Sequence, residues 1–300
     1  MDPGLGESSG RFSNSRISLK TIGIVGAGTM GAGIAHVAAL SGFDVLLYDV
    51  SENVLAQAVG KIASELQTGV EKGRISPLQA SEANSRIHPH SSLEQLSSSD
   101  AVIEAALESL DIKRDIFRNL ESICRPETIF ASNTSSLSIT AIAAGVKNAN
   151  RVVGMHFFNP PQRMKLVEVV RGHHTSDETV QRTVELARQL EKHPVLVKDA
   201  PGFIVNRIAR PFYGEALRLL AEGVASVEEI DRIVKLEGNF KMGPFELMDL
   251  IGIDVNFAVT KSMYEQTFGE ARYRPHVIQQ SMVNAGLFGR KTGRGFYKYP

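Results

Sequence analysis

The sequence predicts an α/β protein, in which a doubly wound, mainly parallel sheet is followed by a second domain made only of helices. Three observations support this fold class. Short apolar runs alternate with helical patterns over the first two thirds of the chain, which is typical of βαβ units. A glycine-rich turn separates the first apolar run from the first helical pattern. Beyond residue 200 the strand-like runs stop and the pattern is helical.

The βαβ rhythm can be followed element by element. Strands are predicted at 21–26, 44–49, 101–106, 128–133 and 151–158, and helices between them at 29–41, 52–72 and 109–123. Right-handed crossovers between such strands make a doubly wound sheet the expected topology.

The pattern changes twice after this region. Two β-branched runs within 151–170 are separated only by Asn-Pro-Pro-Gln-Arg-Met, which favours a hairpin-like return. After "KHPVLVKDAPGF" no strand follows, so we place a domain boundary near Asp199–Pro201, with Pro201 where a helix can start. The expected organisation is a flexible Gly/Ser-rich tail at 1–16, an α/β domain at 17–200 and a helical domain at 201–300.

Composition limits the classes of function. The 300 residues hold 33 basic and 33 acidic side chains, so no bulk attraction to nucleic acid or to a membrane surface is expected. Thr21 to Phe43 is free of Asp, Glu, Lys and Arg, but its six glycines argue against a membrane span. Cys124 is the single cysteine, which fits a reducing, cytoplasmic location and gives no reason to expect a metal site.

The first turn has the spacing of a dinucleotide-binding loop. "GIVGAGTMGAG" places Gly26, Gly28 and Gly31 after a strand and at the start of a helix, where they allow a tight turn and close approach of a pyrophosphate. Asp49 ends the second strand, where a carboxylate can accept from an adenosine ribose. No Arg or Lys follows it in "VSEN", so NAD is preferred to NADP. A glycine turn that binds nothing, or a nucleotide site without redox chemistry, stays open at this point.

Polar side chains gather where strands of this Rossmann-type sheet should end, which is where ligands bind in doubly wound folds. They are Glu104 and Glu108, the serines of "ASNTSS" at 131–136, and His156 to Asn159 in "HFFN". The serines are equally typical of a helix N-cap, and the two roles can coexist. Glu104 is interpreted as structural.

His156 and Glu168 lie at equal distances from the centre of the predicted hairpin. If the two runs pair about Gln162, His156 faces Glu168, and their side chains come within hydrogen-bonding reach. A carboxylate in this position fixes the ring tautomer and stabilises the imidazolium, which suits a histidine that exchanges a substrate proton. A purely structural pair is the alternative.

In these motifs the chain resembles the 3-hydroxyacyl-CoA dehydrogenases, including the 3-hydroxybutyryl-CoA dehydrogenases. The resemblance runs from Lys20 to Tyr299 and rests on six landmarks in order: "GIVGAGTMGAGIA", "ASNTSSLSIT", "GMHFFNPPQRMKLVEVV", "KDAPGFIVNR", "MGPFELMDLIGID" and "GRKTGRGFYKY". It implies an NAD-binding Rossmann-type domain, a helical domain that binds substrate and dimerises, and an active site between them.

The resemblance also implies roles for individual residues. The implied catalytic residues are His156, Glu168, Ser135, Asn159 and Asn206; the implied cofactor contacts are Gly26, Gly28, Thr29, Met30, Gly31, Asp49, Glu108, Lys113, Ser135, Asn159 and Lys291; the implied substrate contacts are Ser135 and Lys72. One position departs from the family pattern, because Glu65 stands where the family has a serine that contacts CoA.

The implied reaction is NAD-dependent oxidation of an (S)-3-hydroxyacyl-CoA to a 3-oxoacyl-CoA, or the reverse reduction of acetoacetyl-CoA, in fatty acid or butanoate metabolism. The expected partners are an acyl-CoA thioester and a second copy of the chain. The alternative is an L-gulonate dehydrogenase of the λ-crystallin type, which acts on a free hydroxy acid. A non-catalytic NAD-binding protein is a further class, against which the intact His156, Glu168 and Asn206 argue.

Overall fold

The computed structural model describes residues 19–300, and its first domain is built on one eight-stranded sheet. The strands are β1 (Thr21–Val25), β2 (Asp44–Tyr48), β3 (Ile87–His90), β4 (Ala101–Glu104), β5 (Ile129–Ser132), β6 (Val152–Phe157), β7 (Leu166–Arg171) and β8 (His193–Lys198). Their order is β3-β2-β1-β4-β5-β6-β7-β8, parallel except where β7 runs antiparallel to β6. The first six strands have the doubly wound order, which confirms the predicted fold class.

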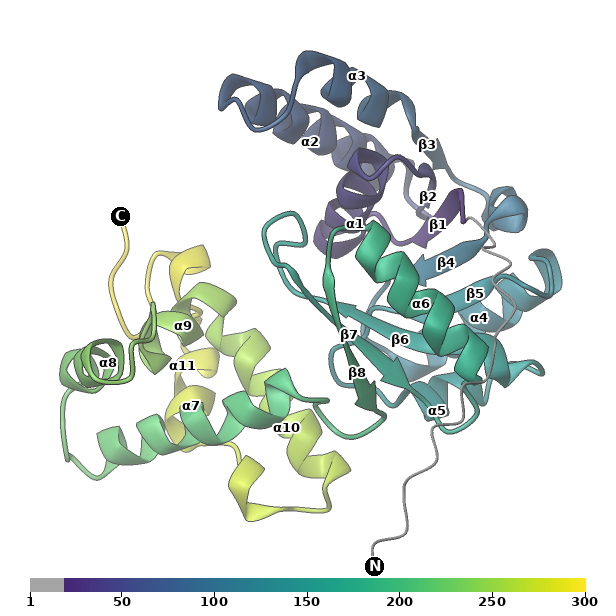
Figure 1. Ribbon diagram of the computed structural model, residues 1–300. Coiled ribbons are helices and arrows are strands. Elements are labelled where there is room, and N and C mark those ends of the chain that lie inside the picture. The colour runs from purple at the N-terminus through teal and green to yellow at the C-terminus, as the bar shows by residue number, and fades with distance from the viewer. Residues whose placement is uncertain (1–18) are drawn as a thin grey trace, which may run out of the picture.

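Helices cover both faces of this sheet, and a separate helical lobe follows β8 (Figure 1). The first domain contains α1 (Thr29–Leu40), α2 (Glu52–Glu71), α3 (Pro77–Ser85), α4 (Leu110–Ile123), α5 (Ile139–Ala143) and α6 (Asp177–Gln189). The helical lobe contains α7 (Val205–Ala221), α8 (Val227–Leu236), α9 (Pro244–Ile251), α10 (Ile253–Gln266) and α11 (Val277–Asn284). The predicted helices 29–41, 52–72 and 109–123 correspond to α1, α2 and α4 within one residue at each end.

Burial explains why these segments take these forms. The central strands are apolar on both sides, as expected for a parallel sheet with helices on each face. Two clusters of buried side chains result, one around Ile24 and Leu47 and the other around Phe117 and Phe130. A third cluster, which includes Phe245, fills the helical domain.

β3, α3 and α6 were not predicted from the sequence, and the first two show why. β3 carries Pro89 between two histidines, and it can do so because it lies at the edge of the sheet, where proline costs no ladder hydrogen bond to a further strand. α3 lacks a strong apolar stripe, but Ser76 and Gln79 form a capping box at its start and Pro77 occupies its first turn.

The start of the helical domain differs from the expectation. Pro201 was expected at a helix start, but α7 begins at Val205. Gly202 and Phe203 have φ of +72° and +50°, in the left-handed region that a helix cannot include. The segment therefore turns before it enters α7.

The predicted tail at 1–16 lies outside the described residues. Within 19–300, no helix combines the length and apolar character needed to cross a bilayer, and Thr21 to Phe43 forms β1, α1 and their turns.

Candidate active site

The turn between β1 and α1 fits a pyrophosphate. Gly26 has φ of +97°, and a Cβ on Gly31 would lie 1.7 Å from the carbonyl oxygen of Gly26, so neither position accepts a side chain. At Gly28 nothing lies within 4 Å of an added Cβ, which leaves open space above the backbone. Gly28 caps α1 without a side chain, and the first turn of α1, which begins with Thr29 and Met30, holds no acidic residue. The first N–H groups of α1 are therefore available to an anion.

Asp49 stands at the end of β2 beside this turn. Its Oδ2 accepts from the N–H of Ala27 at 2.8 Å, and its Oδ1 accepts from the N–H of Ser51 at 3.0 Å. The carboxylate is thereby tied to the glycine turn and to the start of α2, which fits its predicted place beside a nucleotide ribose. The chain thus holds residues that suit NAD at each position that the fold requires.

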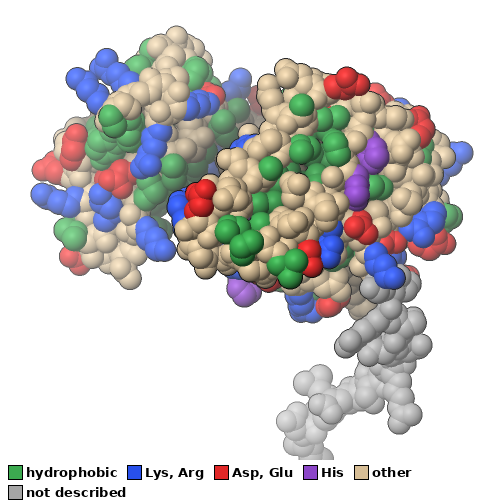
Figure 2. Space-filling model, turned by 90° about the horizontal axis from the view of Figure 1, so that it is seen from above, with side chains coloured by type: hydrophobic (Ala, Val, Ile, Leu, Met, Phe, Trp, Pro, Cys, Tyr) green, Lys and Arg blue, Asp and Glu red, His purple; other side chains and the backbone are tan. Residues whose placement is uncertain are grey.

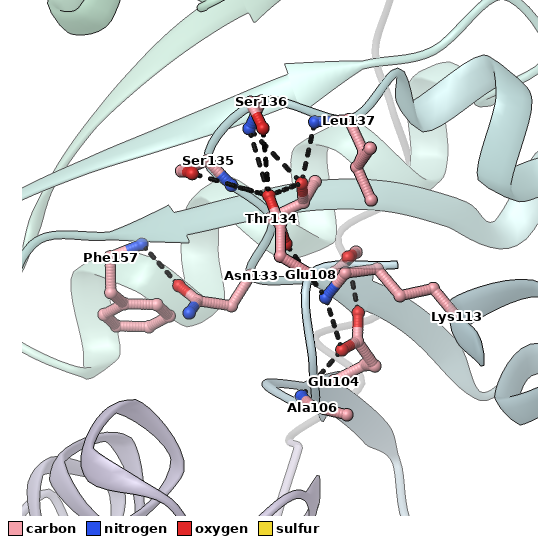
Figure 3. A network of polar contacts seen from close by, with 11 residues as sticks. Glu104, Ala106, Glu108, Lys113, Asn133, Thr134, Ser135, Ser136, Leu137 and Phe157 are labelled. Atoms are coloured by element: carbon pink, nitrogen blue, oxygen red, sulfur yellow. Dashed lines mark hydrogen bonds and ion pairs between the residues drawn. The ribbon is translucent and has the colours of Figure 1, made fainter. Parts of the chain in front are cut away.

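A polar network joins the ends of β4 and β5 (Figure 3). The Lys113 ammonium lies 2.6 Å from Oε1 of Glu104 and 3.3 Å from Oε2 of Glu108. Ser132 donates to the other oxygen of Glu104 at 2.6 Å. Lys113 and Glu104 are both buried, so this is an ion pair in the interior with its oxygens satisfied. Glu104 is structural, as predicted.

Glu108 gathers the loop that contains the serines. Its Oε1 accepts from the Thr134 hydroxyl at 2.6 Å and from the N–H groups of Ser135 and Ser136 at 3.0 and 3.3 Å. Partial burial works against the charge, but Lys113 and these donors outweigh it and hold the pKa of Glu108 below its usual range. The serine run itself does not cap a helix, because the N-cap of α5 is Ser138, two residues beyond the run.

The predicted hairpin register is confirmed. β6 and β7 pair with His156 opposite Glu168, and Nδ1 of His156 lies 2.8 Å from Oε2 of Glu168. Both residues are buried, and the His156 ring lies between Phe158 and Phe203, with ring centroids 4.5 and 5.9 Å away. The carboxylate holds one ring nitrogen, which leaves Nε2 for a proton of a ligand.

Glu168 also joins the two domains, a contact that the sequence did not reveal. Its Oε1 accepts from the N–H groups of Ile204 and Val205 at 2.9 and 3.0 Å, at the start of α7. Burial raises the cost of ionising Glu168, but the hydrogen bond from His156 and those from Val205 and Ile204 hold its pKa below the usual range. One carboxylate therefore fixes both the imidazole and the entry into the helical domain.

Asn206 reaches across from the helical domain. Its Nδ2 donates to the carbonyl of Ser135 at 3.3 Å, and its Oδ1 accepts from Nη2 of Arg210 at the same distance. Ser135 and Asn206 are thus brought together, as the resemblance implied. Arg210 was missed. The sequence did offer a signal for Arg210, because a charged residue stands among the buried positions of α7. Lys113 stands among the buried positions of α4 in the same way.

Two further predicted residues, Asn159 and Lys291, form no hydrogen bond or ion pair with the His156–Glu168 pair in the described residues. Asn159 is exposed and precedes Pro160 through a cis peptide bond. Lys291 forms an ion pair with Asp254 at 2.6 Å, within the helical domain. Nothing in these contacts assigns either residue to a nucleotide.

Lys72 lines a cavity of about 660 Å³ between α1, α2 and the β6–β7 turn. Its wall carries five cationic side chains, Lys72, Arg74, Arg163, Lys165 and Lys192. Glu65, the departure from the family pattern, also lines it and bonds to Nδ1 of His36 at 3.1 Å and to Nε2 of Gln162 at 2.6 Å. Glu191 lines the wall as well, 3.8 Å from the Lys165 ammonium. Five cationic side chains thus face two carboxylates, and this excess of positive charge suits an anionic group.

A dinucleotide turn, an acid at the end of β2 and a histidine–carboxylate pair between β6 and β7 together define an NAD-dependent dehydrogenase. Residues 21–200 match the family described as "3-hydroxyacyl-CoA dehydrogenase, NAD binding domain" and residues 202–299 match "3-hydroxyacyl-CoA dehydrogenase, C-terminal domain". The chain belongs to the 3-hydroxyacyl-CoA dehydrogenase family. The predicted family, cofactor and class of oxidoreductase are confirmed.

Individual relatives agree with this assignment. The 3-hydroxyadipyl-CoA dehydrogenase of Escherichia coli is 47% identical over 94% of this chain, which spans 60% of that protein. The 3-hydroxybutyryl-CoA dehydrogenase of Clostridioides difficile is 42% identical over 93% of this chain and 99% of its own length. The crystal structure of (S)-3-hydroxybutyryl-CoA dehydrogenase from Ralstonia eutropha is 45% identical, with a TM-score of 0.91 over 94% of this chain and all of that one.

Proposed function

We propose that this chain catalyses reversible, NAD-dependent oxidation of (S)-3-hydroxyacyl-CoA thioesters to 3-oxoacyl-CoA, with His156 as the proton carrier. The 2.8 Å contact between His156 and Glu168 carries the proposal. When bound, NAD supplies the hydride chemistry, and Gly26, Gly28 and Asp49 are the residues that would hold it.

The chain's own residues have distinct tasks in this reaction. In oxidation Nε2 of His156 takes the proton of the C3 hydroxyl, and Glu168 stabilises the imidazolium that results. In reduction the imidazolium returns that proton. Ser135, Asn159 and Asn206 are proposed to orient the reacting oxygen and the thioester, and Phe158 and Phe203 limit the access of water to the ring.

The basic cavity beside α2 supports a CoA thioester over a free acid. We propose that Lys72 and its cationic neighbours receive the phosphates of the CoA moiety. Glu65 should weaken phosphate binding at this site, because its carboxylate adds a negative charge to the wall of the cavity. Lys113 and Glu108 are proposed to contact the nicotinamide-proximal part of NAD. Lys291 is proposed as a further contact with NAD, for which it would have to leave its ion pair with Asp254.

We also propose a homodimer formed by residues 201–300, with the NAD-binding unit at 17–200. Exposed apolar side chains on the helical domain include Ile208, Ile233, Leu236, Phe240 and Phe268. Figure 2 shows hydrophobic side chains gathered on the helical lobe at the left of the view. Sedimentation at micromolar concentration tests the proposal, and a monomer mass would contradict it. A cytoplasmic location belongs to the same proposal and rests on the lone cysteine, Cys124.

One assay separates the candidate reactions. NADH oxidation is followed with acetoacetyl-CoA, with free acetoacetate and with 3-dehydro-L-gulonate, the keto acid of an L-gulonate dehydrogenase. We expect turnover of the thioester alone, and weaker use of NADPH than of NADH because Asp49 repels a 2′-phosphate. Turnover of a free keto acid without turnover of the thioester would overturn the proposed function.

The activities of two relatives suggest two substrate classes. One is a short unsubstituted acyl group, as in 3-hydroxybutyryl-CoA, and the other is an acyl group that ends in a carboxylate, as in 3-hydroxyadipyl-CoA. The reaction and the proton carrier are the same for both classes.

A further inference from the structure

Hydrogen bonds between the two domains are few, and they end at the proposed active site. Among residues 19–300, four such bonds join the α/β domain to the helical domain. Two are accepted by Glu168, as described above. The other two are accepted by carbonyl groups of the loop at 134–137, which we call the serine loop. The helical domain thus meets the α/β domain at groups that are proposed to act on the substrate.

Two side-chain amides hold the serine loop from two different helices. Nδ2 of Asn206, on α7, donates to the carbonyl of Ser135 at 3.3 Å. Nε2 of Gln266, the last residue of α10, donates to the carbonyl of Ser136 at 2.9 Å. A carbonyl can only accept, so the nitrogen of each amide must face it. No backbone N–H of the described residues donates to either carbonyl, which leaves the two amides as their partners.

The opposite edge of the serine loop is held by the α/β domain (Figure 3). Oε1 of Glu108 accepts from the N–H groups of Ser135 and Ser136 at 3.0 and 3.3 Å. The Ser135 hydroxyl lies 3.4 Å from the same oxygen, a long contact that a ligand can replace. Both residues therefore have their N–H groups bonded to one domain and their carbonyls to the other. Since the loop has no regular secondary structure, these bonds set the direction of the Ser135 hydroxyl.

Gln266 is itself held in place before it reaches the loop. Its Nε2 also donates to Oγ of Ser262, one turn earlier on α10, at 2.8 Å. Met263 lies between them in sequence and is fully buried, and a Cβ on Gly202 would come within 2.4 Å of its Cε. The end of α10 thus packs closely against the entry to the helical domain, with the Gln266 amide oriented toward the serine loop.

Arg210 connects the helices that carry the two amides. Its Nη1 donates to the carbonyl of Asn256 at 2.9 Å and to Oγ1 of Thr260 at 3.1 Å, both on α10. Its Nη2 donates to Oδ1 of Asn206 on α7 at 3.3 Å. The buried guanidinium therefore fixes α10, and with it Gln266, relative to Asn206.

We propose that Gln266 is a positioning residue of the dehydrogenase reaction. It holds the carbonyl of Ser136 and thereby directs the hydroxyl of Ser135 toward the reacting oxygen, without touching the substrate itself. The proposal rests on the proposed function, in which Ser135 orients that oxygen. It adds a residue that the resemblance to the family did not indicate.

Gln266→Met tests the proposal, because methionine has a similar length and no donor. With acetoacetyl-CoA and NADH, kcat per NADH-binding site should fall by about five- to tenfold, the effect of one hydrogen bond. Counting the sites by NADH titration removes unfolded protein from the comparison. Gln280→Met is the matched control and should keep the kcat of the wild type. Gln280 is exposed on α11, and its side chain takes part in none of the hydrogen bonds within residues 19–300.

Gln266→Glu separates the hydrogen bond from packing. Glutamate has the shape of glutamine, but its ionised carboxylate cannot donate and repels the carbonyl of Ser136. Its kcat should be at least as low as that of Gln266→Met. A kcat near that of the wild type in either variant would overturn the proposal, since neither side chain can donate.

A double-mutant cycle with Ser135→Ala shows whether Gln266 acts through Ser135. If it does, the hydroxyl is already lost in Ser135→Ala, and adding Gln266→Met should change kcat/KM by less than about twofold. If Gln266 supports the fold in general, the two losses multiply. Multiplied losses would therefore contradict the proposal, even if Gln266→Met alone lowers kcat.

Failure of the proposed function has a different signature. In that case the wild type would not reduce acetoacetyl-CoA at all. Turnover by the wild type with an unchanged kcat in Gln266→Met would contradict the role of Gln266 and leave the dehydrogenase reaction in place.

Discussion

The two domains bury charged side chains in different ways. In the NAD-binding domain a carboxylate meets a basic side chain directly, as in the Lys113–Glu104 pair at 2.6 Å and the His156–Glu168 pair at 2.8 Å. In the helical domain Asp249 is equally buried but accepts from the N–H groups of Phe296 and Tyr297 and from the Tyr299 hydroxyl. The first arrangement lies at the proposed active site, whereas the second holds the C-terminal segment against the helical domain.

Arg210 belongs to neither type. Asp249, like Asp231, has each oxygen occupied by donors of the chain, whereas Arg210 keeps Nε without a partner in the described residues. A buried charge that is fully hydrogen-bonded within the chain points to a structural role. This contrast predicts that changes to the His156–Glu168 pair affect turnover, while changes to the Lys113–Glu104 pair and to Asp249 act on stability.

The largest effect is expected for His156→Gln. Glutamine keeps some hydrogen bonding but cannot carry the proton, so kcat should fall by about 10²–10⁴-fold with NADH binding nearly unchanged. Steady-state kinetics and NADH titration on folded enzyme measure both quantities. Nearly full turnover would show that this histidine is not the proton carrier. The His156–Glu168 pair would then have no separate role in turnover.

The next effect concerns the buried ion pair. Lys113→Met leaves Glu104 in the interior without its cation and should lower the free energy of unfolding by about 3–5 kcal/mol. The double variant Lys113→Met with Glu104→Gln removes both charges and should recover much of that loss. Chemical denaturation of the two proteins gives the difference. Equal losses in both would mean that the charges do not stabilise each other.

Glu168→Gln should act on both catalysis and pH dependence. A neutral amide no longer stabilises the imidazolium, so kcat should fall by about 10–100-fold, as for other partners that orient a histidine. In the oxidation direction the acid limb of the pH–rate profile should move to lower pH, since His156 then protonates less readily. A profile that stays in place would contradict the assigned role of the carboxylate.

The lowered pKa of Glu168 adds a stability test. Folding lowers this pKa from 4.5, so the carboxylate's contribution is complete above pH 4.5 and is lost as the pH falls through the lower folded value. Melting temperatures between pH 3 and 6 should therefore fall less steeply in Glu168→Gln than in the wild type. Parallel curves would show that Glu168 does not contribute to acid sensitivity.

Sequence patterns predicted the parts of the site that depend on local geometry. The facing of His156 and Glu168 followed from strand pairing alone, because alternation fixes the register once the turn is known. The bonds from Glu168 to the start of α7 did not follow, because they depend on how the two domains meet. The same explanation holds for the contacts of Arg210 and for the pairing of Lys113 with Glu104, because a helical pattern shows that a side chain faces inward but not which residue it meets.

The smallest effect on turnover is expected for Asp249→Asn. The amide can accept only some of the three hydrogen bonds from the C-terminal segment, so the free energy of unfolding should fall by about 1–3 kcal/mol. Burial and the hydrogen bond to Asp249 raise the pKa of Tyr299 to about 12, so the wild type should lose stability as the pH rises from 10 through 12. In the variant Tyr299 should ionise at lower pH, which absorbance titration of the tyrosines measures.

Glu215→Gln is the matched control for Asp249→Asn, because Glu215 forms an exposed pair with Arg218 and its loss should change the unfolding free energy by less than about 1 kcal/mol. We expect both variants to keep the kcat of the wild type on folded enzyme, since neither residue contacts the His156–Glu168 pair. A fall in kcat for Asp249→Asn without loss of folded protein would contradict the comparison. It would mean that the position of Asn206 depends on the buried acids of the helical domain. Those acids would then affect turnover as well as stability.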